Sequence, residues 1–257
     1  MEFETLATGG FGLLEAPCWD GNGGVYFSDV LQGGVRRWSD GGVEDVLPKR
    51  RGIGGMCLHA DGGLVVSGRN VLHVRNGEQR VLLGELEGVT GFNDLATDSD
   101  GRVYVGALRF SPFAGEAPVP GQVWRIEADG AAPVLEGIDW PNGIGFAPGG
   151  ATMYACDYAH GTVLGGDGEV FARSPAGADG LAVDGEGGVW VATGEGGAIA
   201  RFAADGSLDH TVAIPADFVS SLCFGGEDMR DVYVTTVGSL LRGRSDVPGL
   251  PLAPARV

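Results

Sequence analysis

Apolar and polar positions alternate in short segments along almost the whole chain. One pattern recurs six times: a polar residue, a short apolar stretch, a turn rich in Gly and Asp, and a stretch of Val, Tyr, Trp or Leu. The copies are EAPCWDGNGGVYFSDV (15–30), GGMCLHADGGLVVSGR (54–69), FNDLATDSDGRVYVGA (92–107), PNGIGFAPGGATMYACD (141–157), ADGLAVDGEGGVWVAT (178–193) and SSLCFGGEDMRDVYVTT (220–236). Two apolar stretches joined by residues that tolerate positive φ are typical of a β-hairpin.

The spacing of the copies predicts the architecture. The second strands are expected to begin at Val25, Leu64, Val103, Met153, Val189 and Val232, at intervals of 39, 39, 50, 36 and 43 residues. A third strand follows each hairpin, for example 34–38, 122–126 and 198–202. This is the period of a four-stranded propeller blade. The sequence therefore predicts an all-β fold, a six-bladed β-propeller with antiparallel blades around a central channel, as one domain over residues 1–257.

Ring closure and one long loop need separate explanations. An open propeller would expose two sheet edges, so we expect 3–7 to pair as the outer strand of the blade that contains 232–236. The longest interval contains the segment RFSPFAGEAPVPG (109–121), which is too long for a simple turn. Loops of this length are commonly functional, and we expect this one near a mouth of the channel.

Composition and charge narrow the functional classes. The 17 Lys and Arg against 34 Asp and Glu give a net charge of −17, which disfavours nucleic acid as a partner. The first residues lack the features of a signal peptide, and no apolar run is long enough for a membrane helix. The four cysteines are widely spaced in apolar stretches and are expected to be buried free thiols. We expect a cytoplasmic protein that does not bind membranes and is a monomer or a weak homodimer.

Equivalent positions of the inner strands carry an unusual set of polar residues. Counted back from the second strands, these positions hold Glu15, Gly54, Asn93, Asn142, Asp179 and Ser221 or its neighbour Ser220. Single residues of this kind commonly cap the starts of strands. Several in register, with two carboxylates among them, instead favour a site for a cation with oxygen ligands.

Other candidate residues have weaker support. The four histidines occupy unrelated positions of the repeat, so no Ser-His-Asp or Cys-His arrangement is indicated. Trp140 adjoins Asn142 and either packs between blades, as the other tryptophans are expected to do, or forms a pocket wall that contacts substrate. Arg109 opens the long loop and is either a solvated side chain or a substrate contact.

Four segments of the chain resemble signature segments of the senescence-marker-protein/gluconolactonase/regucalcin family and occur in the same order. The resemblance extends over about residues 10–245. The segments are 15–19 (EAPCW), 91–94 (GFND), 141–143 (PNG) and 179–184 (DGLAVD). The resemblance implies a six-bladed propeller with one divalent cation in the channel, bound by Glu15, Asn142 and Asp179. It also implies that Asn93 binds substrate or a metal-bound water and that Asp179 is the general base. Calcium is the first expectation for the ion, with magnesium, manganese and zinc as alternatives.

The function implied by this resemblance is metal-dependent hydrolysis of a small lactone or ester, gluconolactonase-like, in which the metal polarises the carbonyl and Asp179 takes a proton from water. Members that act on sugar acids often carry Arg directly before the Phe-Asn-Asp stretch, where this chain has Gly91. A less hydroxylated lactone is therefore expected as substrate. The alternatives are an organophosphate or phosphotriester hydrolase on the same scaffold, a non-enzymatic metal-binding propeller, and a propeller for protein interaction.

Overall fold

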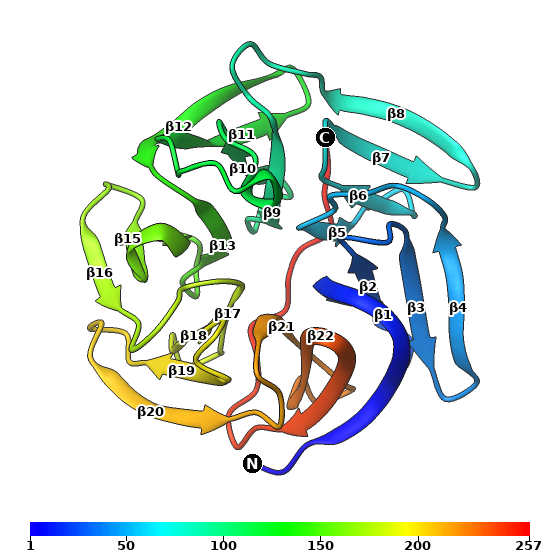
Figure 1. Ribbon diagram of the computed structural model, residues 1–257, viewed down its shortest axis with the longest axis vertical. Coiled ribbons are helices and arrows are strands. Elements are labelled where there is room, and N and C mark those ends of the chain that lie inside the picture. The colour runs from blue at the N-terminus through cyan, green and yellow to red at the C-terminus, as the bar shows by residue number, and fades with distance from the viewer.

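The computed structural model describes residues 1–257 and consists almost entirely of antiparallel strands arranged around a central axis (Figure 1). The strands form five hydrogen-bonded sheets. The all-β propeller class with antiparallel blades is therefore confirmed. The only helical segments are two short 3-10 turns, η1 (Pro112–Ala114) and η2 (Tyr158–His160). The chain forms no helix of the length and hydropathy that crossing a membrane requires.

Four of the sheets contain four strands each. The first comprises β5 (Met56–Leu58), β6 (Leu64–Val66), β7 (Val71–Arg75) and β8 (Glu78–Leu83), and the second β9 (Gly91–Thr97), β10 (Val103–Leu108), β11 (Gly121–Glu127) and β12 (Gly130–Ile138). The third comprises β13 (Pro141–Phe146), β14 (Met153–Asp157), β15 (Thr162–Gly165) and β16 (Val170–Arg173), and the fourth β17 (Leu181–Val183), β18 (Val189–Ala192), β19 (Ala198–Phe202) and β20 (Leu208–Ala213).

The fifth sheet has six strands. The prediction of six blades is wrong, because the strands form five sheets. Its order is β21-β22-β1-β2-β3-β4, with β1 (Glu4–Trp19), β2 (Val25–Asp29), β3 (Val35–Ser39), β4 (Gly42–Leu47), β21 (Val219–Gly225) and β22 (Asp231–Arg244). The first half of β1 pairs with β22 and its second half pairs with β2. Because both long strands continue through their bends, the first and last sequence repeats share one sheet, so that the structure has five blades.

The predicted ring closure is confirmed by this pairing. Glu4 lies opposite Arg242 and Thr5 opposite Leu241, in the part of β22 that follows 232–236. The predicted hairpins are also present: five second strands begin at the predicted residue, and the last begins at Asp231, one residue before Val232. The second strands are almost completely buried, which is why the sequence shows them as short apolar runs.

Hydrogen bonds join neighbouring repeats close to the channel. Each links the inner part of one repeat to the next: Ser28 Oγ to Ile53 O (2.6 Å), Phe92 N to Gly68 O (2.6 Å), Asn93 Nδ2 to Pro141 O (3.0 Å), Gly143 N to Asp179 O (3.0 Å), Gly180 N to Ser220 O (2.8 Å) and Ser220 Oγ to Leu14 O (2.6 Å). The inner strands are therefore fixed relative to one another, which positions any side chain that they direct into the channel.

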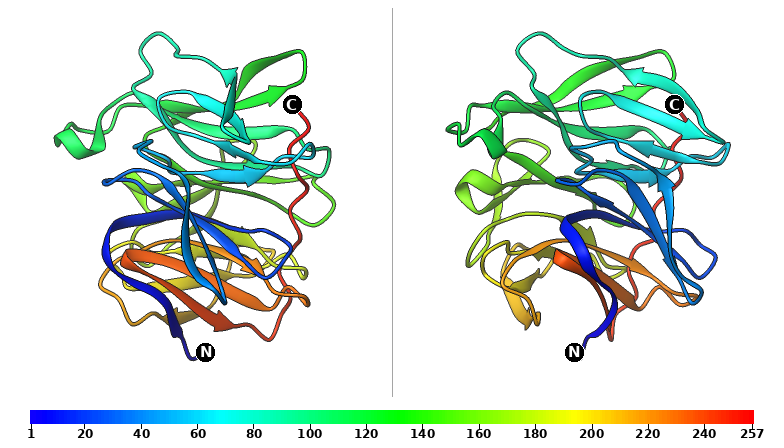
Figure 2. Two further views of the ribbon diagram at one scale, coloured as in Figure 1. Left: turned by 90° about the vertical axis from the view of Figure 1, so that its right-hand side faces the viewer. Right: turned by 45° about the vertical axis from the view of Figure 1, so that its right-hand side comes forward.

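The two ends of the channel differ. The C-terminal segment runs across one end, where the Leu250 amide donates to Val183 O (2.9 Å), the Ala255 amide to Leu58 O and the Arg256 amide to Gly101 O (both 2.8 Å). These bonds tie together hairpins from separate sheets. Figure 2 shows this segment, in red, on one side of the molecule and η1 on the other. The long loop 109–121 thus lies on the face away from the C-terminal segment.

Candidate functional site

The polar residues in register all come from inner strands or from the residues just before them. Glu15 lies on β1, Asn142 on β13 and Asp179 two residues before β17. Their exposed fractions are 9%, 7% and 4%. Asn93 lies on β9 and is partly buried, and Ser221 lies on β21 and is buried. The predicted residues are therefore found on the strands that line the channel.

Three buried carboxyl groups dominate the electrostatics of this region: Glu15, Asp179 and Asp94, the last on β9. Burial raises the pKa of Glu15 well above its usual value, and the charges of Asp179 and Asp94 raise it further. Burial and then the charge of Asp94 raise the pKa of Asp179, while Asn142, within hydrogen-bonding reach, lowers it. Burial raises the pKa of Asp94 to about 7. The Leu95 amide, which donates to Asp94 Oδ1 at 2.7 Å, acts in the opposite direction and lowers this pKa.

None of these three acids forms an ion pair with Arg, Lys or His. Placing several carboxylates together in a buried region is unfavourable unless a cation or protons neutralise them. Two carboxylates and an amide oxygen are donors that suit a hard divalent ion. The donor set of Glu15, Asp179 and Asn142 therefore fits such an ion, although no group of three or more His, Cys, Asp or Glu residues is arranged as a metal cluster.

Glycines make room for the amide and hydroxyl groups of the ring. A Cβ at Gly54 would lie 2.2 Å from Asn93 Oδ1, and a Cβ at Gly180 would lie 2.1 Å from Ser221 Oγ. The Asn93 amide donates one N–H to Pro141 O, which leaves its second N–H free. Of the two serines that the register allowed, Ser220 uses its hydroxyl in the hydrogen bond to the first repeat. Ser221 is therefore the one available to the channel.

An aromatic cluster stands beside the acids. Phe110 packs edge-on against Trp140 with ring centroids 5.1 Å apart, and Trp140 packs against Tyr158 at 4.8 Å. The charges of Asp179, Glu195 and Glu15 act on the Tyr158 hydroxyl, so this end of the cluster is near the acids. Trp140 therefore belongs to a wall between the long-loop side and the channel, and its contact with substrate remains a prediction.

Two other candidates lie at the rim. Arg109 is exposed, forms no ion pair, and donates to Pro120 O at 3.4 Å, within its own loop. Its contact with substrate therefore also remains a prediction. His160, for which the sequence offered no partner, lies 2.8 Å from Asp139 through Nε2. The four cysteines are buried and free, as expected.

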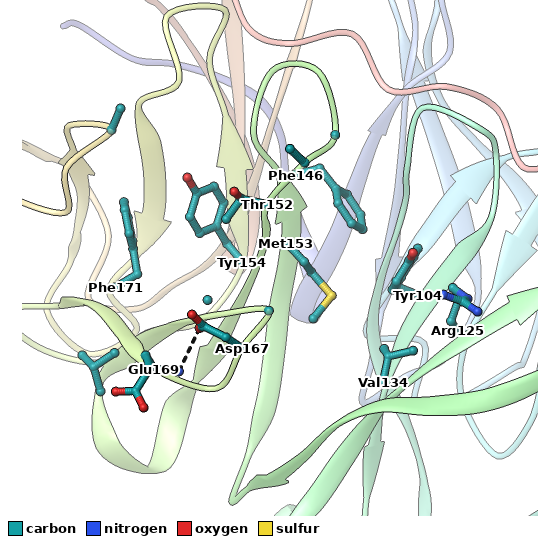
Figure 3. A pocket seen from close by; sticks show the side chains of 16 residues that line it. Tyr104, Arg125, Val134, Phe146, Thr152, Met153, Tyr154, Asp167, Glu169 and Phe171 are labelled. Atoms are coloured by element: carbon teal, nitrogen blue, oxygen red, sulfur yellow. Dashed lines mark hydrogen bonds between the residues drawn. The ribbon is translucent and has the colours of Figure 1, made fainter.

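A cavity of about 640 Å³ lies elsewhere (Figure 3). It lies on the outer side of the sheets, between β10–β12 and β14–β16, where β15 and β16 have only four residues each. Its walls include Tyr104, Met153, Tyr154 and Phe171, and none of the predicted site residues. We therefore assign the candidate site to the channel, where the unneutralised acids are.

Comparisons with known proteins bear on the family of this chain and on its reaction class. Residues 13–238 match the family described as the SMP-30/Gluconolactonase/LRE-like region. Among curated proteins, the pentonolactonase XacC of Haloferax volcanii is 31% identical over 245 residues, covering 88% of this chain and 82% of that protein. The 6-deoxy-6-sulfogluconolactonase of Pseudomonas putida is 32% identical over 249 residues, covering 87% and 83%.

A solved structure extends the likeness to the fold. The calcium-binding protein regucalcin from Agrobacterium tumefaciens superposes with a TM-score of 0.86 at 20% identity, covering 98% of this chain and 97% of that one. The chain belongs to the SMP-30/gluconolactonase/regucalcin-like family. It is an enzyme of the hydrolase class.

Sequence reasoning missed two residues of this region, Asp94 and Tyr158. Asp94 follows Asn93 directly, and the register selected only one residue per repeat. Tyr158 begins η2 just after β14, at a place where the other repeats have Val30, Arg69, Leu108, Gly194 and Val237. An aromatic residue at that place was the available signal, but only the structure reveals its neighbours.

Proposed function

We propose that this chain opens the ring of a small lactone, acting as one domain over residues 1–257. The observation that carries the proposal is the group of buried acids, Glu15, Asp94 and Asp179, which lack any cationic partner and lie beside an aromatic wall. Relatives at 31% and 32% identity are named as lactonases, which supports the same reaction class here.

The proposed ion is divalent, with calcium as the first expectation, since all donors are oxygens and a relative in fold is described as calcium-binding. Glu15, Asn142 and Asp179 would hold it. When bound, such an ion supplies polarisation of a carbonyl group and lowers the pKa of water.

The residues of the chain would then divide the remaining work. Asp179 would take the proton of the attacking water as general base. The free N–H of Asn93 would donate to an oxygen of the lactone as negative charge develops on it. Trp140 would pack against the face of the substrate, and Arg109 would contact it from the rim.

The substrate is proposed to be less hydroxylated than a sugar-acid lactone, because Gly91 offers no side chain to bind hydroxyl groups. Gly91 pairs with Leu108 at the start of β9 and lies close to the Gly68 carbonyl. Because two relatives are named as a pentonolactonase and a 6-deoxy-6-sulfogluconolactonase, the main alternative is a preference for sugar-acid lactones. The buried free thiols suit a reducing compartment, which supports a cytoplasmic location.

A substrate panel on chelator-treated protein tests this proposal. Aliphatic γ- and δ-lactones, sugar-acid lactones and phosphotriesters are offered with calcium, magnesium, manganese and zinc added back one at a time. We expect hydrolysis of lactones that returns with a divalent ion, with aliphatic lactones preferred. Phosphotriester hydrolysis without lactone hydrolysis would reassign the reaction, and strong preference for gluconolactone would refute the role given to Gly91.

A further inference from the structure

Tyr158 is held in place by its backbone and by a buried acid. Its amide donates to Trp140 O at 3.0 Å. The Asp157 carboxylate, 4% exposed, accepts from the amides of Trp140 (3.1 Å) and Ala159 (3.2 Å). This carboxylate therefore ties the start of η2 to the segment that leads into β13. The residues on either side of Tyr158 are fixed relative to Asn142, two residues beyond Trp140.

The ring of Tyr158 lies in a slot that two glycines leave open. A Cβ at Gly177 would lie 3.0 Å from the ring, and a Cβ at Gly194 would lie 2.8 Å from the hydroxyl oxygen. On another side the ring packs against Trp140 at 4.8 Å between centroids. Contacts from three segments therefore leave the ring little freedom, and any side chain other than hydrogen at the two glycines would press on it.

The hydroxyl at the end of this ring has no hydrogen-bond partner within the protein, although the residue is partly buried. Burial, and then the charges of Asp179, Glu195 and Glu15, raise its pKa to about 12. The phenol consequently keeps its proton at neutral pH and is a donor. A fixed, unused donor next to the channel acids can serve a ligand in the channel at little entropic cost.

We propose that Tyr158 is a substrate-binding residue whose hydroxyl donates a hydrogen bond to an oxygen of the bound lactone. This inference rests on the proposed function, because it takes the lactone as the ligand. It assigns the wall formed by Phe110, Trp140 and Tyr158 two roles: the indole contacts the apolar face of the substrate, and the phenol at the end of the wall orients a polar atom. An uncharged donor also binds an oxygen without neutralising the acids beside it.

Tyr158→Phe removes the hydroxyl and keeps the ring in its slot. We expect kcat/KM for the best lactone of the panel to fall about tenfold, the size of one lost hydrogen bond to a bound substrate. The thermal midpoint and the affinity for the divalent ion should stay unchanged. Tyr154→Phe is the matched control, since Tyr154 lies on β14, the strand that leads into Tyr158, but packs against Phe171, at the outer cavity. Its kcat/KM should equal that of the wild type.

Gly177→Ala provides an independent test, because it displaces the ring and keeps the hydroxyl. We expect a several-fold lower kcat/KM, and no further loss when Gly177→Ala is added to Tyr158→Phe, since both act through one hydroxyl. If the Tyr158→Phe enzyme were as active as the wild type, or if the losses in kcat/KM from the two substitutions were fully additive, the assignment of Tyr158 would be overturned but the proposed function would stand. A wild-type protein that hydrolyses no lactone would instead refute the proposed function, and this inference with it.

Discussion

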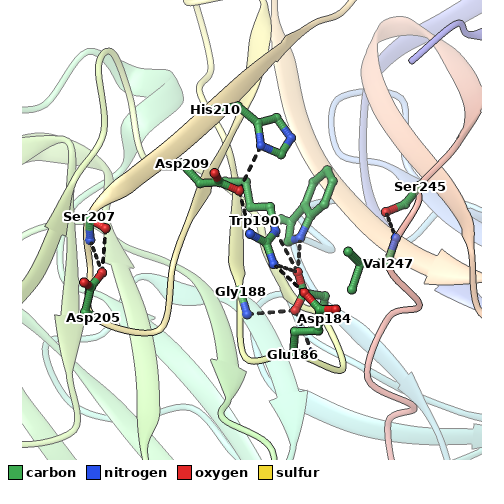
Figure 4. Close-up of polar contacts among 11 residues, drawn as sticks. Asp184, Glu186, Gly188, Trp190, Asp205, Ser207, Asp209, His210, Ser245 and Val247 are labelled. Carbon is green, nitrogen blue, oxygen red and sulfur yellow. Dashed lines mark hydrogen bonds and ion pairs between the residues drawn. The ribbon is translucent and has the colours of Figure 1, made fainter.

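Two groups of buried carboxylates in this protein, those at two hairpin ends and those in the channel, have opposite surroundings. At the hairpin ends, Asp184 is completely buried and accepts hydrogen bonds from the amides of Glu186 and Gly188, the indole of Trp190 and the guanidinium of Arg201 (Figure 4). Asp98, 3% exposed, likewise accepts from two amides, from Arg102 and from Tyr104. Each of these acids has enough donors of its own.

In the channel, Glu15, Asp94 and Asp179 are about as deeply buried but lack cationic partners, and their pKa values are raised. The hairpin acids show what this chain supplies when a carboxylate has only a structural role. The absence of cationic partners in the channel is therefore informative, because a buried acid without a cationic partner within the protein is suited to an external one, such as a cation or a proton from a reaction.

The sharpest test of this contrast is Asp179→Asn. If Asp179 is the general base, lactone hydrolysis should fall by about 10²–10⁴-fold, the usual contribution of such a group, whereas metal affinity should fall much less. The thermal midpoint of the metal-free protein should stay the same or rise, because a buried charge is removed. Rates are measured at saturating divalent ion. A variant that hydrolyses the lactone at nearly the wild-type rate would place the base elsewhere.

Asp184→Asn is the converse change in the other region. Removing the charge leaves Arg201, only 11% exposed, without this partner. We expect a loss of about 3–5 kcal/mol in unfolding free energy, as for breaking a buried ion pair. Urea unfolding measures the loss, and kcat/KM at 25 °C should remain within about twofold of the wild type. An inactive but fully stable variant would contradict the structural role.

Glu15→Gln tests the channel as a cation site. The amide retains one ligand oxygen and loses the charge, so we expect divalent-ion affinity to fall by about 10–100-fold. Activity at low metal should fall with it and recover in part at excess metal. Calorimetry on chelator-treated protein gives the affinity. An unchanged affinity would remove Glu15 from the proposed ligand set.

The sequence predicted those parts of the fold that depend on local turn chemistry. Gly- and Asp-rich turns fix each hairpin independently, so the starts of the second strands, such as Val103 and Val189, could be predicted to the residue. The number of sheets could not, because it depends on whether β1 and β22 stay hydrogen-bonded through their bends. The course of the C-terminal segment was also beyond prediction, since its contacts with Val183 and Leu58 are distant in sequence and carry no periodicity.

For the candidate site, the repeat register selected residues that the structure places on inner strands or just before them, among them Glu15, Asn142 and Asp179, but their roles stay predictions. The register could not find Asp94, because neighbouring residues of a strand are expected to face opposite sides. It could not find Tyr158 either, since the residues at the equivalent place of the other repeats share no residue type with it. Such residues are brought to the site by packing between repeats rather than by the repeat itself.

The smallest expected effect concerns Asp94, and it depends on pH. In the folded protein Asp94 keeps its proton up to about pH 7, whereas the usual value for Asp is 3.8. Between these values the folded state binds more protons than the unfolded state, so the contribution of this group to stability falls as pH rises from about 4 to 7 and stays low above 7. Asp94→Asn removes this dependence. One pKa unit corresponds to about 1.4 kcal/mol of unfolding free energy. Because water in the channel screens the charge of Asp94, we expect only roughly 1–2 kcal/mol of the stability to depend on this group.

Thermal unfolding of chelator-treated protein at pH 5 and pH 8 measures this effect. The thermal midpoint of the Asp94→Asn variant should be a few degrees higher than that of the wild type at pH 8, and the difference should be smaller at pH 5. Asp98→Asn is the matched control, because it alters a hairpin acid that the protein satisfies, and it should lower the midpoint at both pH values. If Asp94→Asn also destabilised the protein equally at both, Asp94 would belong with the hairpin acids, and the channel would contain two unneutralised acids rather than three.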